Sequence, residues 1–121
     1  MYTLRGKVIY GARRGKKLGF PTANIRLHKN IPQGIYVSRV KLGEHRFNSA
    51  TFIGNATTFG SKEKLVETHI LSFGKNIYNT WITVTLIKKI RDSEKFKSSQ
   101  DLIDQIGKDI VKVEKYFKEN V

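Results

Sequence analysis

The sequence predicts a mainly β protein, a closed antiparallel barrel or a sandwich of about six strands, with one helix at its C-terminal end. Short segments rich in β-branched and aromatic residues are separated by turn residues at the spacing of hairpins. The C-terminal segment instead repeats apolar residues every three or four positions, which is the period of a helix. Strands at hairpin-like spacing favour an antiparallel barrel or sandwich over a parallel sheet.

Six segments carry the strand pattern. In the second, Ala23, Ile25 and Leu27 alternate with polar residues, as in a strand with one buried face. Gly43-Glu44 predicts a two-residue hairpin turn, and Lys75-Asn76 predicts a turn further along the chain. The predicted strands are 2–10, 23–28, 35–42, 46–53, 65–73 and 81–90.

The C-terminal segment predicts one amphipathic helix packed on the strands. Ser98, with Asp101 three residues later, or Ser99 can cap its first turn. We expect a single domain over 1–121, with the strands in about 1–92 and the helix in about 99–119. The apolar stripe of this helix consists of Leu102, Ile106, Ile110, Val113 and Phe117.

Composition excludes several classes of protein. The chain has 121 residues, of which 39% are hydrophobic, enough to form the core of one domain. It has no cysteine, which excludes disulfide scaffolds, thiolate zinc sites and cysteine nucleophiles. No apolar run is long enough for a membrane helix, and the first residues lack a signal-peptide pattern, so we expect no membrane partner and a cytoplasmic location.

The net charge of +13 is concentrated at one end of the sequence. The first 43 residues contain no acidic residue, and such a one-sided charge indicates an anionic partner. Charge alone leaves a nucleotide, a nucleic acid and an acidic surface as alternatives. The basic residues of this segment are Arg5, Lys7, Arg13, Arg14, Lys16, Lys17, Arg26, Lys29, Arg39 and Lys41.

A glycine-rich basic loop precedes the second predicted strand. Gly11, Gly15 and Gly19 are spaced four apart, with Lys16 and three other basic residues among them. Glycine allows backbone N–H groups to approach a phosphate closely, and lysine adds positive charge. The loop lacks the Walker pattern, so a flexible basic loop or an RNA-backbone contact remains an alternative to a phosphate site.

Two further positions carry candidate chemistry. Thr22 and Asn24 lie two apart after Pro21, so they share one face of a strand and offer hard oxygen ligands for Mg²⁺; the alternative is a turn with a polar strand edge. Glu67 lies in an apolar strand and could accept a hydroxyl proton, with His69 as a rival base on the same face. The alternative for Glu67 is a solvated strand residue.

Together these motifs resemble the riboflavin kinase family, including the C-terminal module of bacterial bifunctional riboflavin kinase/FAD synthetase. The Pro21-Thr22-Ala23-Asn24 box followed by Glu67-Thr68-His69 is the most specific part of the resemblance, which covers nearly the whole chain. Further matching segments are Gly6-Lys7-Val8, Gly34-Ile35-Tyr36, Ile53-Gly54-Asn55, Ile77-Tyr78, Ile90-Arg91 and Lys95-Phe96, with Leu102 and Asp109.

The resemblance implies a six-stranded antiparallel Greek-key barrel with a C-terminal helix, and transfer of a phosphoryl group from ATP to riboflavin to give FMN and ADP. It implies that Thr22 and Asn24 hold Mg²⁺, that Glu67 is the base for the ribityl 5′-hydroxyl, and that Arg91 and Phe96 border the flavin. The positions expected near ATP are Gly11, Gly15, Lys16, Gly19, Thr22, Ile70, Ser72 and Tyr78.

The chain also departs from the family pattern in loops near the substrates. Ala12 stands where an acidic residue is common, Ala56-Thr57 replaces Arg-Pro, and Asn76 and Asn79 flank Ile77-Tyr78 in place of an Asp-Leu-Tyr-Gly box. The FMN adenylyltransferase domain of the bifunctional enzymes is not in this sequence, so the chain is either a stand-alone kinase or a module for which that domain is the expected partner; nucleic acid is not an expected partner. The alternative function is a small basic barrel that binds RNA without catalysis.

Overall fold

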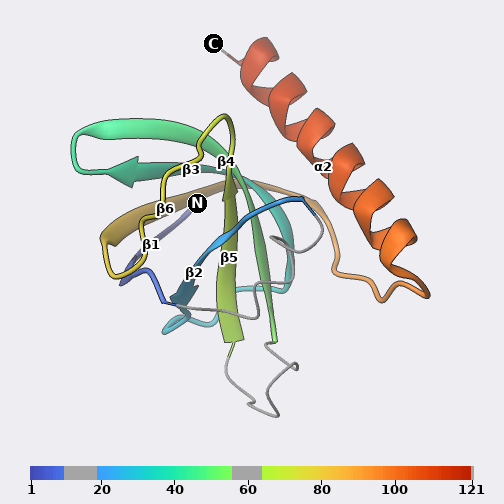
Figure 1. Cartoon of the computed structure of the whole chain (residues 1–121), viewed down its shortest axis with the longest axis horizontal. Coiled ribbons are helices and arrows are strands. Elements are labelled where there is room, and N and C mark those ends of the chain that lie inside the picture. Colours follow the sequence, from blue (N-terminus) through green and yellow to red (C-terminus); the bar gives the residue numbers. More distant parts are fainter. Residues whose placement is uncertain (10–18, 56–63, 121) are drawn as a thin grey trace.

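The computed structural model describes residues 1–9, 19–55 and 64–120. Within these ranges the chain forms antiparallel strands followed by one long helix (Figure 1). The predicted phosphate-loop residues Gly11, Gly15 and Lys16, and the departures at Ala12 and Ala56-Thr57, lie outside the described residues. The elements are β1 (Tyr2–Lys7), β2 (Ala23–Arg26), β3 (Gly34–Leu42), β4 (His45–Asn55), β5 (Lys64–Ile70), β6 (Trp81–Arg91) and α2 (Ser99–Glu119).

The strands form one antiparallel sheet that curls into a nearly closed barrel. Their order is β1-β6-β3-β4-β5-β2, so the first two strands of the sequence lie at the two edges of the sheet. An isolated bridge between Ile9 and Asn24 brings these edges together. This confirms the predicted six-stranded antiparallel barrel with a C-terminal helix.

The hairpin between β3 and β4 forms where the sequence predicts it. Leu42 pairs with His45, which leaves Gly43 and Glu44 as a two-residue turn. Gly43 has a φ of +60°, a left-handed conformation that glycine adopts without a side-chain clash. This turn fixes the register of the hairpin and hence which residues of both strands face inward.

The barrel interior is apolar except for a chain of hydroxyl groups. Ile25, Ile53 and Val84 belong to a fully buried aliphatic cluster. Beside them, four buried side chains from β3, β4 and β5 are hydrogen-bonded in series, with oxygen–oxygen distances of 2.6, 2.6 and 2.9 Å. Buried hydroxyls are tolerated when they pair with one another. The series runs Ser49, Ser38, Thr51 and Thr68.

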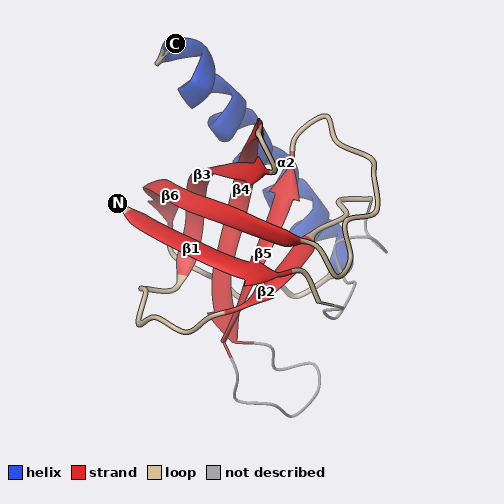
Figure 2. Cartoon of the chain, turned by 90° about the vertical axis from the view of Figure 1, so that its left-hand side faces the viewer, coloured by secondary structure: helices blue, strands red, loops and turns tan. Residues whose placement is uncertain are grey.

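The helix α2 covers the outer face of β3 and β4, on the side of the barrel away from β1 (Figures 1 and 2). The Ser98 side chain accepts a hydrogen bond from the Asp101 N–H, so Ser98 is the capping residue of the two that the sequence allows. Val113 and Val37 are fully buried between helix and sheet. An ion pair between Asp109 and Arg91 adds a second attachment near the end of β6.

The connection between β5 and β6 differs from the predicted one. The sequence predicts a strand to residue 73 and a turn at Lys75-Asn76, but β5 ends at Ile70. Ser72 has a φ of +55°, which no continuing strand allows. Residues 71–80 therefore form an extended loop between the strands, and this loop becomes one wall of the candidate site.

Candidate functional site

Polar side chains gather where β2 runs beside β5. Asn24 lies directly opposite Glu67 in the antiparallel register, and Ala23 lies opposite Thr68. Directly opposed residues point to the same face of a sheet, so Asn24 and Glu67 share a face, and His69 belongs to that face by alternation. Thr22 comes just before β2 and lines the same pocket as Asn24. The fold thus brings together the two predicted metal ligands, the predicted base and its rival.

Asn24 carries a buried oxygen that no hydrogen bond from the described part of the chain satisfies. Its side chain is 3% exposed, and its amide nitrogen donates to the Thr22 carbonyl oxygen at 3.4 Å. The Oδ1 atom of Asn24 has no hydrogen-bond partner among the residues that the structure describes. A buried polar atom without a partner is costly in an ordinary core, so it indicates a position that a ligand completes.

The side chain of His69 on β5 contacts the segment that precedes Asn24. The Nδ1 atom of His69 lies 2.8 Å from the Pro21 carbonyl oxygen. The Phe20 ring meets the His69 ring edge to face, with centroids 5.9 Å apart. These contacts hold the chain just before Thr22, where the backbone pairing of β2 with β5 has not yet begun.

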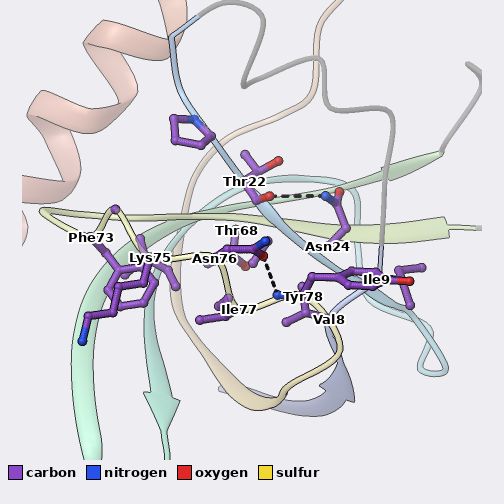
Figure 3. A pocket seen from close by; sticks show the side chains of 14 residues that line it. Val8, Ile9, Thr22, Asn24, Thr68, Phe73, Lys75, Asn76, Ile77 and Tyr78 are labelled. Atoms are coloured by element: carbon purple, nitrogen blue, oxygen red, sulfur yellow. Dashed lines mark hydrogen bonds between the residues drawn. The ribbon is translucent and has the colours of Figure 1, made fainter.

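A pocket of about 340 Å³ opens beside this polar group (Figure 3). Its walls come from the end of β1, the start of β2, β5 and the loop after β5. Thr22 and Asn24 lie on one side, and Tyr78 with its neighbours in the loop lies on another. The largely apolar part of the lining consists of Val8, Ile9, Ile70, Phe73, Ile77 and Tyr78.

Backbone hydrogen bonds hold the pocket walls together. The N–H of Val8 donates to Thr80, and the N–H of Asn79 donates to Val8, both at 2.8 Å. Asn79 has a φ of +68°, a conformation that asparagine tolerates better than most residues. The Asn76 side chain accepts the Tyr78 N–H at 2.9 Å, which shapes the loop at the pocket (Figure 3).

The predicted nucleotide residues fall in different places. Thr22, Ile70 and Tyr78 line the pocket, and Tyr78 is 45% exposed. Ser72 lines a separate hollow beside α2, together with Phe117. Gly19 has a φ of +89° at the approach to Pro21, and a Cβ atom added there would meet none of the described atoms within 4 Å.

The predicted flavin residues lie beside α2, with Phe96 just before the helix and Arg91 against its middle. Arg91 makes two hydrogen bonds of 2.8 Å to the Asp109 carboxylate, and its guanidinium carbon lies 5.9 Å from the centroid of the Phe96 ring. The guanidinium is therefore already paired with a carboxylate. Its geometry makes Arg91 a link between the barrel, the helix and Phe96.

The sequence reasoning missed several residues of the site. Val8 and Ile9 read as ordinary strand residues, and only the closure of the barrel brings them to the pocket. The attachment of His69 to Pro21 joins residues 48 positions apart and has no local signal. Within 1–9, 19–55 and 64–120, no group of three acidic or histidine side chains could hold a metal ion.

Comparison with known families identifies relatives along almost the whole chain. A family model described as riboflavin kinase, or flavokinase, matches residues 1–117. The bifunctional riboflavin kinase/FMN adenylyltransferase of Haemophilus influenzae is 38% identical over 119 residues. The protein of that name from Buchnera aphidicola subsp. Schizaphis graminum is 41% identical over 125 residues. Each match covers 96% of this chain and only 39% of the relative.

Solved structures share the barrel. The crystal structure of riboflavin kinase from Trypanosoma brucei matches with a TM-score of 0.66 and 27% identity, covering 96% of this chain and 79% of that one. A crystal structure named as a macrolide-efflux protein from Streptococcus pneumoniae matches with a TM-score of 0.78 and 34% identity, covering 88% of this chain and 36% of that one. In the part of this chain that the structure describes, no helix is long and apolar enough to cross a membrane.

Proposed function

Because the chain belongs to the riboflavin kinase family, we propose that it transfers the γ-phosphoryl group of ATP to the ribityl 5′-hydroxyl of riboflavin, giving FMN and ADP with the help of Mg²⁺. The observation that carries this proposal is the buried, unsatisfied Asn24 Oδ1 beside Thr22 and opposite Glu67 in the described part of the chain. The proposal assigns a role to each of these three side chains.

Thr22 and Asn24 fit a magnesium ion. The Asn24 amide is turned so that its nitrogen binds the Thr22 carbonyl oxygen, which leaves the oxygen Oδ1 as the unsatisfied atom among the described residues. A hydroxyl and an amide oxygen are suitable ligands for Mg²⁺, which takes few protein ligands and completes its shell with water and phosphate oxygens. Bound there, the ion would neutralise charge on the transferred phosphoryl group.

Glu67 is proposed as the general base. Its carboxylate would accept the proton of the ribityl 5′-hydroxyl while that oxygen forms a bond to the γ-phosphorus and the bond from phosphorus to the ADP oxygen breaks. Its position opposite Asn24 supports this role, because base and metal ligand then face the same space. His69 is the rival base: its Nδ1 is engaged by the Pro21 carbonyl oxygen, and we favour Glu67 because Glu67 lies directly opposite Asn24.

The pocket is proposed to hold the nucleoside part of ATP. Its apolar walls, formed by Val8, Ile9, Phe73 and Ile77, suit a planar base, and Tyr78 lies at its exposed side. The loop with Gly11, Gly15 and Lys16, followed by Gly19, would meet the phosphates, as the family resemblance implies. Ser72 lines the hollow beside α2 and not this pocket, so its proposed place near the nucleotide rests on the family resemblance alone.

The flavin is proposed to bind beside Phe96 and the start of α2. Phe96 offers a partly buried ring for contact with the isoalloxazine system. Arg91, paired with Asp109, would hold the position of this side of the site relative to the barrel.

The wider setting of the reaction is also a proposal. The chain spans 39% of the length of the curated relatives, whose names include FMN adenylyltransferase, and we propose such a domain as a partner and the cytoplasm as the location. The RNA-binding alternative has less support, since Tyr36 belongs to the core, and Phe47 and Phe73 pack against it. A stacking platform needs such rings to be accessible.

The decisive experiment is a product assay with ATP, Mg²⁺ and riboflavin, followed by chromatographic detection of FMN. Glu67→Gln should lower turnover by about 10² to 10⁴ because it removes the base. Glu44→Gln, in the exposed β3–β4 turn, is the matched control and should leave turnover unchanged. Near-wild-type turnover of a folded Glu67→Gln variant would refute the base assignment.

The metal assignment has its own readout. Thr22→Val and Asn24→Ala should each shift the Mg²⁺ dependence of nucleotide binding to higher concentration, because each removes a ligand oxygen. Unchanged Mg²⁺ dependence in both variants would remove this pair as ligands, whatever the result for Glu67.

A further inference from the structure

His69 is the titratable side chain of the site to which the proposed reaction gives no task. It lies on β5, two residues after Glu67, and its ring contacts both Pro21 and Phe20. We infer that His69 is a positioning residue: it fixes the backbone before Thr22 and so sets the place of the Thr22 and Asn24 oxygens. This inference rests on the proposed function, since it gives these oxygens their role as ligands.

His69 holds the backbone at a point that the strand pairing does not reach. The ladder between β2 and β5 begins at the pair Ala23 and Thr68. Pro21 has no N–H, so it cannot donate a further ladder bond to β5. Its carbonyl oxygen instead accepts from His69 Nδ1 at 2.8 Å, and this side-chain contact extends the attachment beyond the end of the ladder.

The contact with Pro21 also determines the form of the imidazole. A carbonyl oxygen can only accept a hydrogen bond, so Nδ1 of His69 must carry the hydrogen. In the neutral ring the lone pair then lies on Nε2. The contact therefore needs a donor at the Nδ1 position, and it does not need the acid–base chemistry of histidine.

A short series of contacts connects His69 to the ligand oxygens. Thr22 follows Pro21 directly, and the carbonyl oxygen of Thr22 accepts a hydrogen bond from the Asn24 amide nitrogen at 3.4 Å. That bond turns the amide so that Oδ1 remains unsatisfied by the described residues. Holding Pro21 thus limits the movement of Thr22, and Thr22 in turn orients Asn24, in a sequence of contacts that starts at β5.

The test compares two amides that differ in reach. Asparagine carries its amide nitrogen at the same distance from Cβ as Nδ1 of histidine, whereas the amide of glutamine corresponds to Nε2. We expect His69→Gln to raise the Mg²⁺ concentration needed for half-maximal binding of a non-hydrolysable ATP analogue by about fivefold, the equivalent of one lost hydrogen bond. His69→Asn should stay within about twofold of the wild type, because it restores the donor.

A second pair of variants separates positioning from general stability. If His69 acts by placing the Thr22 and Asn24 oxygens, then adding His69→Gln to Thr22→Val should raise the required Mg²⁺ concentration by less than about fivefold, because one of the two placed oxygens is already gone. Riboflavin affinity, followed by quenching of flavin fluorescence, should be the same in all these variants. Equal loss in His69→Asn and His69→Gln, no loss in either, or a full additional loss in the Thr22→Val background would overturn the inference.

The outcomes also distinguish this inference from the proposed function. Wild-type protein that shows the expected pattern of Mg²⁺-dependent nucleotide binding but forms no FMN would refute the reaction and leave the positioning role standing. If the wild type forms FMN but His69→Asn and His69→Gln need the same Mg²⁺ concentration for nucleotide binding, the proposed reaction stands and the positioning role is refuted. Absence of Mg²⁺-dependent nucleotide binding in the wild type would overturn both.

Discussion

Replacing Asp109 by alanine should destabilise the fold more than any change on the exposed side of α2. The carboxylate accepts two hydrogen bonds from Arg91 and one from Gln105, at 2.8, 2.8 and 3.0 Å. The side chains of Arg91 and Asp109 are only 15% and 5% exposed. The variant would therefore leave a largely buried guanidinium without its carboxylate.

The size of the effect follows from that burial. Removing one partner of a buried ion pair costs about 3–5 kcal/mol, because the remaining charge stays desolvated. We take the lower end, about 3 kcal/mol, since Arg91 keeps a hydrogen bond to the Asp92 carbonyl oxygen. For a chain of this size, each kcal/mol of lost stability lowers Tm by about 4 °C, so we expect Tm to fall by about 12 °C.

Urea denaturation followed by circular dichroism, together with thermal melting, would measure this loss. Asp104→Ala is the matched control, because Asp104 lies on the same helix, is exposed and accepts a hydrogen bond from Gln100. It should change the free energy of unfolding by less than about 0.5 kcal/mol. The combination of Arg91→Met with Asp109→Leu should recover much of the loss, since it removes both charges.

Two results would refute this account of the ion pair. A loss below about 1 kcal/mol in Asp109→Ala would show that the guanidinium finds water or another partner once the carboxylate is gone. A double variant no more stable than Asp109→Ala would show that packing of the helix, and not an unpaired charge, determines the loss. Either result would remove the ion pair as the attachment of α2 to β6.

Three further predictions concern the barrel. Thr51→Val should lower the free energy of unfolding by about 1–3 kcal/mol, because the buried Thr68 hydroxyl loses its partner in the series and Ser38 keeps only Ser49; an unchanged urea midpoint would contradict this. Burial raises the pKa of Tyr36 above 10.0, so its contribution to stability is complete below pH 10.0 and is lost as pH rises through the raised pKa. Tyr36→Phe should flatten the alkaline fall in stability, and an equally steep fall would contradict that cause. Gly34→Ala should lower Tm, since φ is +151° and the new Cβ would lie 2.6 Å from the Arg91 carbonyl oxygen; an unchanged Tm would contradict it.

Much of the fold can be predicted because it is encoded locally. Alternation places Ile25 and Asn24 on opposite faces, and Gly43-Glu44 specifies both a turn and a register. The sequence predicts the strand β5, but it does not predict that β5 ends at Ile70. The far end of the loop after β5 is held by hydrogen bonds from Val8 to Thr80 and from Asn79 to Val8, which join segments about 70 residues apart and have no local signal.

The candidate site is predictable in its residue types and less so in its contacts. The sequence predicts that Thr22 and Asn24 lie together, and both line the pocket, whereas the pairing of Asn24 with Glu67 requires the order of strands in the barrel. Asp109 is a clearer case, since helix periodicity gives no reason to bury a carboxylate. Its burial follows from Arg91, a residue 18 positions earlier that only the packed helix brings near.

One strand, β5, serves both the core and the proposed chemistry, and alternation keeps these tasks apart. Thr68 faces inward, is 1% exposed and ends the buried hydroxyl chain through Thr51. Its neighbours Glu67 and His69 face the opposite side, where Asn24 and the Pro21 carbonyl oxygen lie. A change at Thr68, which also lines the pocket, should therefore act on stability and on nucleotide binding, whereas a change at either neighbour should act mainly on metal-dependent binding or turnover. Because a one-residue slip in register would exchange the two faces, the hairpin turn at Gly43-Glu44 and the pairing of β4 with β5 protect the site as much as the core.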